Sequence, residues 1–242
     1  MAHTVITSAG ANGAPPQQEA SSMPDQDLRA LLPQVSCAAI VDAMANRYAH
    51  VAHILDLRSP RKDAVLFGQA VTIRYFPTRK DIQHPVDNNF ASLFYRAIEG
   101  GGEGKVLVMG GGGHPDSAFG GGRKLSRLRH NGLAGVLAEG RLRDFDALGD
   151  YEFTTFCRGE TVRQGGNLIM PVAANVPVEI DGVGILPGDY IYADSSGAVV
   201  VPAGVIREVL EEAVESEIRD AASAERMVHE DPATVIAKGE TR

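Results

Sequence analysis

The segment 105–140 constrains the fold of this chain more than any other. An apolar run, 105–109, leads into four consecutive glycines, 110–113, and a second apolar run, 136–138, follows a helical pattern over 118–131. A strand, a glycine-rich loop, a helix and a further strand form a βαβ unit, and the right-handed crossover of such a unit makes its strands parallel. The sequence therefore predicts an α/β domain with parallel strands.

Two segments of this unit directly follow predicted strands. The glycines 110–113 come after the first strand, and the segment 141–144, Arg-Leu-Arg-Asp, comes just after the second. Ligands of open α/β sheets bind beyond the carboxyl ends of parallel strands. We therefore expect both segments to line one crevice.

Apolar spacing predicts the remaining elements. Helices are expected between Ser36 and Asn46, within 87–99 and over 205–221. Short apolar runs predict strands over 65–75, with Gly68 as a bulge or turn, and a β-rich region over 176–201.

The composition along the chain predicts one domain with two flanking segments. Residues 1–24 are rich in Gly, Ala, Pro, Gln and Ser, and we expect a disordered arm there. Residues 25–227 show no internal linker, so one α/β domain is expected, and 228–242 are expected to form a polar tail.

Charge and composition exclude several functions. The chain carries 23 Lys and Arg against 31 Asp and Glu, a formal net charge of −8, which opposes nonspecific binding to phosphate backbones. Its apolar runs are shorter than the roughly 18 to 20 residues that span a bilayer. Because Cys37 and Cys157 are the only cysteines, a disulfide framework is not expected and a CxxC zinc site is impossible. We expect a cytoplasmic protein that binds neither nucleic acid nor membranes.

The glycines 110–113 leave three alternatives open. Their backbone amides could cradle an anion, but Pro115 stands where a dinucleotide fingerprint wants glycine, and no Walker A motif follows. A smaller anion or plain turn geometry is favoured over a nucleotide. Just after the loop, His114 and Asp116 could bind a metal or transfer protons, or form a local hydrogen-bonded turn, and His84 with Asp87 has the same ambiguity.

Nucleophilic catalysis receives little support. Ser196 precedes Gly197 but lacks the glycine that a nucleophile elbow needs two residues earlier. Cys157 follows an apolar run and is expected to be buried rather than reactive.

Arg143 and Asp144 are the most informative pair. Arginine supplies a planar fork suited to a carboxylate, and aspartate supplies an oxygen ligand for a hard cation. Neighbouring residues can face one ligand in irregular backbone, which is expected after a strand. Separate salt bridges on the surface are the alternative.

A set of short motifs carries a family resemblance. They are Ala118-Phe-Gly-Gly-Gly-Arg-Lys-Leu, Gly132-Leu-Ala-Gly-Val, Glu139-Gly140, Arg143-Asp144-Phe-Asp-Ala-Leu, Ile40-Val-Asp-Ala-Met, Phe67-Gly-Gln-Ala-Val-Thr and Gly188-Asp-Tyr-Ile-Tyr-Ala-Asp-Ser-Ser-Gly. Over about residues 30–225 the chain resembles the RraA-like family, which includes the class II pyruvate aldolases for 4-hydroxy-4-methyl-2-oxoglutarate. The resemblance implies a compact αββαβ sandwich of the swivelling-domain kind, with a central mixed sheet, in homotrimers or hexamers with sites between subunits.

The resemblance also implies an activity and its residues. The expected enzyme is a divalent-metal-dependent lyase that cleaves a 4-hydroxy-2-oxo acid to pyruvate and a second carbonyl compound, or decarboxylates oxaloacetate. By this resemblance Arg143 binds the pyruvate carboxylate, Asp144 holds Mg²⁺ or Mn²⁺, and backbone amides around Gly122 and Arg123 complete the carboxylate site, beside Gly121. A bound metal would polarise the 2-oxo group and stabilise the enolate.

One position departs from the family pattern. Many family aldolases carry an aspartate where this chain has Gly122, and His114 and Asp116 are candidates to replace it in the substrate site. Glu217 is the match for a catalytic glutamate that the family takes from the C-terminal helix of a neighbouring subunit.

Two alternative functions stay open. Some family members are regulators that bind and inhibit an RNA-degrading endonuclease, and an acidic protein could cover a basic RNA-binding region. A lyase or hydrolase acting on another small acid is the other alternative, because of Gly122.

Overall fold

One long strand, β2 (Leu66–Pro77), organises the fold in the computed structural model, which describes residues 25–239. It pairs antiparallel with β11 (Tyr190–Asp194) at its start, parallel with β3 (Val106–Gly110) in its middle, and antiparallel with β8 (Ile169–Ala174) at its end. Other strands of this sheet are β1 (His53–Ile54), β5 (Gly135–Ala138), β7 (Thr154–Phe156) and β12 (Gly197–Val201). The order is β1-β12-β11-β2-β3-β5-β7, with β8 joined to β2.

The middle of the sheet confirms the predicted βαβ unit. Strands β3 and β5 are parallel, with Val106 opposite Gly135, and β7 continues the parallel run beside β5. Successive side chains of a strand point to opposite faces, so the fully apolar β3 can supply two cores. Leu107 and Met109 face one core, and Val106 and Val108 face the other. The expected α/β class with a central mixed sheet is therefore confirmed.

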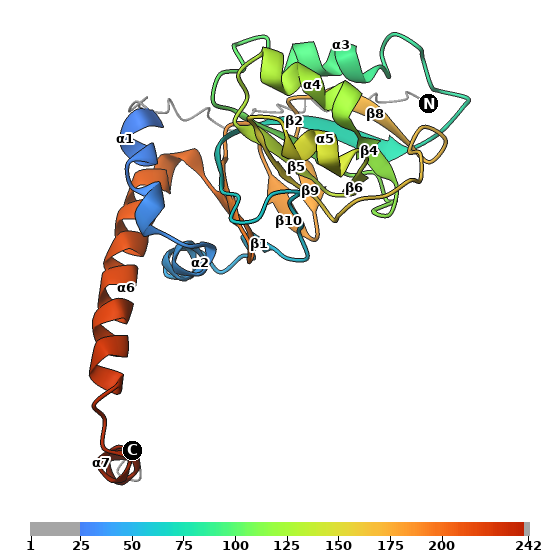
Figure 1. Cartoon of the computed structure of the whole chain (residues 1–242). Coiled ribbons are helices and arrows are strands. Elements are labelled where there is room, and N and C mark those ends of the chain that lie inside the picture. Colours follow the sequence, from blue (N-terminus) through green and yellow to red (C-terminus); the bar gives the residue numbers. More distant parts are fainter. Residues whose placement is uncertain (1–24, 240–242) are drawn as a thin grey trace, which may run out of the picture.

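Helices and a hairpin cover the two faces of the sheet (Figure 1). The helices over the first core are α3 (Phe90–Ala97), α4 (Gly122–His130) and α5 (Phe145–Gly149). The hairpin β9 (Val178–Ile180) and β10 (Val183–Ile185) covers the second core. At the β11 and β12 side, α2 (Cys37–Ala45) packs with α6 (Ile206–Met227) in a third apolar cluster. Shorter elements are α1 (Asp25–Arg29), η1 (Leu32–Gln34) and η2 (Ala203–Val205).

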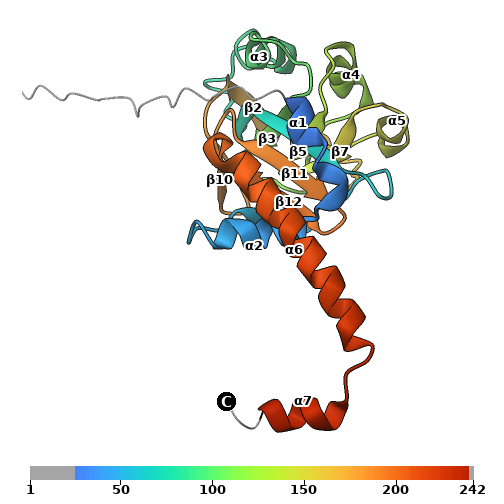
Figure 2. The same ribbon diagram turned by 90° about the vertical axis from the view of Figure 1, so that its left-hand side faces the viewer.

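The C-terminal helix extends beyond the domain. The last fully buried residue of α6 is Ala213, although the helix continues to Met227. Figure 2 shows α6 leaving the body of the protein, with α7 (Pro232–Gly239) at its far end. Eight residues of the predicted polar tail form this helix, which carries the exposed apolar residues Val235 and Ile236. The boundary and the polar character of the tail stay a prediction.

Two predictions of local structure are also wrong. Gly68 is neither a bulge nor a turn, because it lies inside β2, where the backbone of a neighbouring loop comes close; a Cβ there would stand 2.2 Å from the Gly104 carbonyl oxygen. The bulge in β2 lies at Arg74 and Tyr75 instead. The pattern over 118–131 is not helical throughout, since β4 (Ala118–Gly120) pairs with β6 (Arg141–Leu142) before α4 begins.

Two expectations concern the N-terminal part of the chain. The arm predicted over 1–24 lies outside the described residues. Between residues 25 and 239, no single helix is long and apolar enough to cross a membrane; Asp27–Gln34 and Cys37–Ala45 reach the required length only as a pair bent by 109°.

Candidate active site

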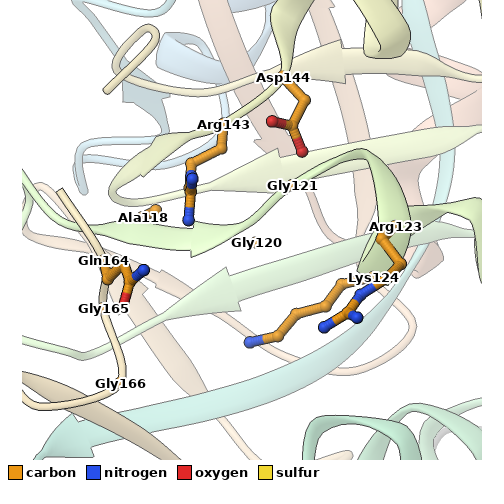
Figure 3. A pocket seen from close by; sticks show the side chains of 10 residues that line it. All are labelled: Ala118, Gly120, Gly121, Arg123, Lys124, Arg143, Asp144, Gln164, Gly165 and Gly166. Atoms are coloured by element: carbon orange, nitrogen blue, oxygen red, sulfur yellow. The ribbon is translucent and has the colours of Figure 1, made fainter. Parts of the chain in front are cut away.

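A cavity of about 450 Å³ opens beside the carboxyl ends of β4 and β6. Three segments line it, from β4 into α4, from the turn before α5, and from the loop that precedes β8 (Figure 3). The lining residues are Ala118, Gly120, Gly121, Arg123, Lys124, Arg143, Asp144, Gln164, Gly165 and Gly166. The structure therefore brings Gly121, Arg123, Arg143 and Asp144 together, as expected.

The amino end of α4 presents open amides to this cavity. The first backbone hydrogen bond of the helix runs from the Leu125 amide to the Gly121 carbonyl, at 3.0 Å. The amides of Arg123 and Lys124 precede it and have no acceptor within the helix. Such amides, together with the helix dipole, favour an anion.

Asp144 has an unusual backbone conformation, and its carboxylate is held by a backbone amide at the start of α4. It stands in the left-handed region (φ 64°, ψ 48°) at the start of α5 but does not cap that helix. Glu160 accepts from the Phe145 amide instead, at 3.0 Å. Asp144 Oδ2 accepts from the Gly122 amide, also at 3.0 Å, which leaves the second carboxylate oxygen available. A Cβ on Gly121 would lie 2.8 Å from Asp144 Oδ2, so glycine is what allows this approach.

Arg143 is free to bind a ligand. Its backbone amide donates to the Gly120 carbonyl at 3.1 Å, which fixes the turn between β6 and α5. Among the described residues its guanidinium makes no hydrogen bond or ion pair. In Figure 3 the guanidinium of Arg143 and the carboxylate of Asp144 face the same space. Within residues 25–239, Arg143 and Asp144 form none of the separate surface salt bridges that the sequence left open.

The glycines 110–113 do not line this cavity, so the expected common crevice is wrong. The loop folds over Glu139, whose Oε2 accepts from the amides of Gly111 at 2.6 Å and Gly112 at 3.0 Å. The anion that this loop holds is thus a carboxylate of the chain itself. These two amides are occupied and do not need an external ligand.

His114 and Asp116 lie outside the cavity lining. Asp116 forms an ion pair with Arg141, at 3.1 Å between Oδ1 and Nε. The His114 carbonyl accepts from the Ser117 amide and hydroxyl, which is the local turn that the sequence left open. Their roles in substrate binding stay predictions that this arrangement does not favour. His84 and Asp87 pair with each other on the surface.

Glu217 lies far along the chain from this cavity. It sits on α6 and accepts from the hydroxyl of Ser36, at 2.5 Å, beside the start of α2. A catalytic role for Glu217 therefore depends on another copy of the chain, as the resemblance implies.

Neither of the other nucleophile candidates is activated. The Cys157 thiol is buried, and burial raises its pKa to about 11. The Ser196 hydroxyl donates to Asp194, which also accepts from the Ser196 amide at 2.8 Å. A serine bound to a carboxylate within its own turn has no base of the kind that nucleophilic catalysis requires.

Sequence reasoning missed part of the cavity wall. Lys124 and the segment Gln164, Gly165 and Gly166 line it, but only their place in the folded chain shows this. The loop reaches the site because the Ala118 amide donates to the Arg163 carbonyl at 3.0 Å. A Cβ on Gly165 would lie 2.2 Å from the Ala118 carbonyl oxygen and 3.1 Å from Ile169 Cγ1, so there is no room for a larger residue there.

The residues present fit a hard divalent cation. Within residues 25–239 no group of three or more His, Cys, Asp or Glu side chains could hold a metal. Mg²⁺, however, usually retains several waters and binds through one or two carboxylates together with its substrate. The uncommitted oxygen of Asp144, at the edge of the cavity, suits that mode of binding.

Gly122 stands where many family aldolases carry an aspartate, and the structure shows what a side chain there would meet. A Cβ there would lie 3.3 Å from the Ala147 Cβ and 3.6 Å from Asp144 Oδ2. A side chain at this position would therefore press against α5 and reach toward Asp144. In this chain α5 packs close to α4 instead.

Comparison with known proteins agrees with this geometry. A family profile described as RraA-like, Aldolase/RraA, matches residues 37–200, which include every cavity residue. The chain belongs to the RraA-like family. The resemblance inferred from the sequence motifs is therefore confirmed.

Two relatives and one solved structure illustrate the family. A protein from Halalkalibacterium halodurans, provisionally named 4-hydroxy-4-methyl-2-oxoglutarate aldolase, is 32% identical over 59% of this chain and 67% of its own length. Protein DlpA of Legionella pneumophila is 26% identical over 78% of this chain. The structure of Streptomyces coelicolor RraAS2, described as an unusual member of the RNase ES inhibitor RraA family, superposes with a TM-score of 0.73, at 26% identity, over 84% of this chain and all of its own. The match with DlpA spans only 28% of that longer protein.

Proposed function

We propose that this chain is a lyase that cleaves a 4-hydroxy-2-oxo acid to pyruvate and a second carbonyl compound, with Mg²⁺ or Mn²⁺ as its cofactor. One observation carries the proposal: the unpaired guanidinium of Arg143 and the uncommitted carboxylate oxygen of Asp144 share a cavity with open helix amides. The names of the aldolase relatives support the same reaction class.

The binding step uses Arg143 and the amino end of α4. A guanidinium binds a carboxylate through two parallel hydrogen bonds, and the open amides of Arg123 and Lys124 add donors on the adjacent wall. A substrate carboxylate held there would leave its 2-oxo group beside Asp144. Asp144 would hold the divalent ion, which when bound supplies Lewis-acid polarisation of the 2-oxo group.

The cleavage step requires two proton transfers. A base removes the proton of the 4-hydroxyl, the bond between C3 and C4 breaks, and its electron pair forms the enolate of pyruvate. A proton then returns to C3. The cationic side chains Arg123, Lys124 and Arg143 face the cavity in which this negative charge develops, and fixed charges of opposite sign lower its free energy.

The base that deprotonates the 4-hydroxyl has to come from another copy of the chain. Glu217 accepts from Ser36, the residue just before α2 of its own chain, and we propose that the Glu217 of another copy serves as the base in a trimer or hexamer. The unpacked part of α6 beyond Ala213 supports association with another copy. Sedimentation of an active monomer would contradict it. A cytoplasmic location remains part of the proposal.

The regulator function is the second candidate. The description of RraAS2 as belonging to an RNase inhibitor family favours it. It requires an acidic surface but no cavity, whereas the lyase requires the arrangement around Arg143 and Asp144. That arrangement is why the lyase is preferred.

The deciding experiment measures pyruvate release from several 4-hydroxy-2-oxo acids and from oxaloacetate, with Mg²⁺ or Mn²⁺. Arg143→Lys should lower kcat/KM at least about 100-fold, because lysine does not reproduce the two parallel hydrogen bonds. Rates must exceed those of the free metal ion, which itself decarboxylates oxaloacetate. Absence of turnover with every substrate, together with inhibition of an RNA-degrading endonuclease, would disprove the lyase and support the regulator.

A further inference from the structure

Glu160 contacts the turn that carries Arg143 and Asp144, although it does not line the cavity. It belongs to the loop that precedes β8, and its Oε1 accepts from the Phe145 amide, at 3.0 Å. Phe145 is the first residue of α5, so its amide has no acceptor within the helix. Glu160 therefore satisfies an open donor at the start of α5 that the side chain of Asp144 does not satisfy.

Asp144 is a residue that would ordinarily cap α5 itself. Aspartate is among the residues preferred at this position, where the backbone is extended and the side chain accepts from an amide of the first helical turn. Asp144 instead stands at φ 64° and ψ 48°, and it accepts from the Gly122 amide of α4. A left-handed backbone costs free energy in residues other than glycine. The missing cap and the backbone strain both favour turning Asp144 away from the cavity.

Backbone contacts hold Glu160 in a fixed place beside the turn. The Leu142 amide donates to the Gly159 carbonyl at 3.0 Å, and the Thr161 amide donates to the Leu142 carbonyl at 2.9 Å. Glu160 lies between these two hydrogen bonds and forms a parallel bridge with Leu142. The Arg141 guanidinium also donates to the Glu160 carbonyl, at 3.4 Å. Glu160 is thus tied to β6, the strand that leads directly into the turn.

We propose that Glu160 is a positioning residue, whose hydrogen bond to the Phe145 amide keeps the Asp144 carboxylate in the cavity, where it is available to a divalent cation. Without that hydrogen bond, the turn relaxes to extended backbone and Asp144 caps its own helix. Because the hydrogen bond supplies the effect, an amide oxygen at residue 160 should serve nearly as well as a carboxylate. The inference rests on the proposed function for the assignment of the metal to Asp144.

The first experiment measures Mn²⁺ binding by electron paramagnetic resonance. Glu160→Ala should weaken the affinity for Mn²⁺ at least about tenfold, whereas Glu160→Gln should stay within about threefold of wild type. An unchanged affinity in Glu160→Ala would overturn the proposal. Equal weakening by the two variants would also overturn it, because the charge of Glu160 rather than its hydrogen bond would then support the metal.

Glu152→Ala is the matched control for this experiment. Glu152 is an exposed carboxylate that pairs with Arg129 of α4, at 3.0 Å, and it makes no contact with the turn 143–145. Its removal changes the net charge by the same amount as Glu160→Ala. The Mn²⁺ affinity of this variant should stay within about twofold of wild type. A loss as large as that of Glu160→Ala would overturn the proposal, since net charge alone would explain both.

The second experiment measures stability and requires no metal. In Glu160→Ala, Asp144 can compensate for the lost hydrogen bond by capping α5. In an Asp144→Gly background no side chain can do so, and glycine adopts the left-handed backbone freely. In urea unfolding, Glu160→Ala should therefore lower the folding equilibrium constant at least about threefold more in the Asp144→Gly background than in wild type. Equal losses in the two backgrounds would mean that Asp144 does not turn, and the proposal would be wrong.

The two experiments separate this inference from the lyase activity. If wild-type protein binds no Mn²⁺, the metal of the proposed function is wrong, and the stability comparison alone decides whether Glu160 positions Asp144. If Glu160→Ala weakens Mn²⁺ binding although no 2-oxo acid is cleaved, the positioning role stands and the proposed reaction is wrong.

Discussion

Two glycine-rich segments of this protein resemble each other in sequence and differ in what they hold. Gly110–Gly113 begins at the last residue of β3, and Gly120–Gly122 begins at the last residue of β4, so both place backbone amides at the end of a strand. The first segment closes on Glu139 through two amide hydrogen bonds. The second gives only the Gly122 amide to Asp144 and leaves the next two amides open.

The difference lies in where the neighbouring carboxylate comes from. Glu139 follows β5, which pairs directly with β3, so its side chain reaches the first loop and fills it. Asp144 approaches the second loop from the turn before α5, and one of its oxygens stays uncommitted. Glycines after a strand therefore show that a backbone can approach an anion, but not whether that anion belongs to the protein or to a ligand.

The largest effect that would test this contrast is expected at Asp144. Asp144→Ala should lower turnover at least about 1000-fold and abolish binding of the divalent ion, because Asp144 is the only carboxylate among the described residues that line the cavity beside β4 and β6. The fold should remain, since the side chain is exposed. Turnover with and without EDTA, and circular dichroism, measure the two parts. Full wild-type activity in EDTA would remove the metal from the proposal.

Alanine at one glycine of each loop should separate activity from stability. In Gly121→Ala the new Cβ would stand 2.8 Å from Asp144 Oδ2, so the carboxylate must move, and kcat should fall about tenfold or more. In Gly112→Ala the Cβ would meet Ile169 and Phe119 in the core, at 2.8 and 2.9 Å, which should cost about 1–3 kcal/mol of unfolding free energy. Equal losses of activity in both variants would contradict the contrast.

The segment Gly110–Gly113 should become less stable when the charge of Glu139 is removed. Glu139→Gln keeps the shape of the side chain but replaces charge-assisted hydrogen bonds to the Gly111 and Gly112 amides by neutral ones. Stability should fall by about 1 kcal/mol while kcat/KM stays within about twofold. Urea unfolding and the pyruvate-release assay measure these. A large loss of kcat/KM with unchanged stability would place Glu139 in the chemistry instead.

The smallest expected effect is a pH dependence of anion binding beside Gly120–Gly122, where Lys124 lines the cavity. Burial and the nearby charges of Arg123 and Arg127 lower the Lys124 pKa, so Lys124 loses its proton at a lower pH than an ordinary lysine. Anion affinity that depends on this charge is complete below the lowered pKa and declines as the pH rises through it. The affinity for pyruvate should therefore decrease severalfold in the alkaline range, earlier than ordinary lysine titration would give. The same titration of Lys124→Met should lack this decrease.

The sequence allowed the βαβ unit to be predicted because its signals are local. Apolar runs, a glycine loop and a helical period stand next to each other, and β3 and β5 lie parallel as expected. Gly68 was misread because the reason for a glycine there is the carbonyl of Gly104, which only the folded chain brings close. Strand β4 was missed because its three residues run directly into α4.

The residues of the candidate site could also be predicted only in part. Arg143 and Asp144 could be named because the family motif contains them, and the cavity contains both. Lys124 stands in a neighbouring motif, but only the folded chain shows that its amine has no ion-pair partner among the described residues. The wall formed by Gln164, Gly165 and Gly166 carries no local signal, since its position depends on contacts with β4.

The left-handed backbone of Asp144 has an evolutionary consequence. That conformation is readily adopted by glycine, asparagine and aspartate but is unfavourable for most other residues. A single base change converts an aspartate codon into an asparagine or a glycine codon. Descendants of this gene can therefore lose the carboxylate in one step without straining the turn, so catalytic and purely binding members of such a lineage can be neighbours in sequence space.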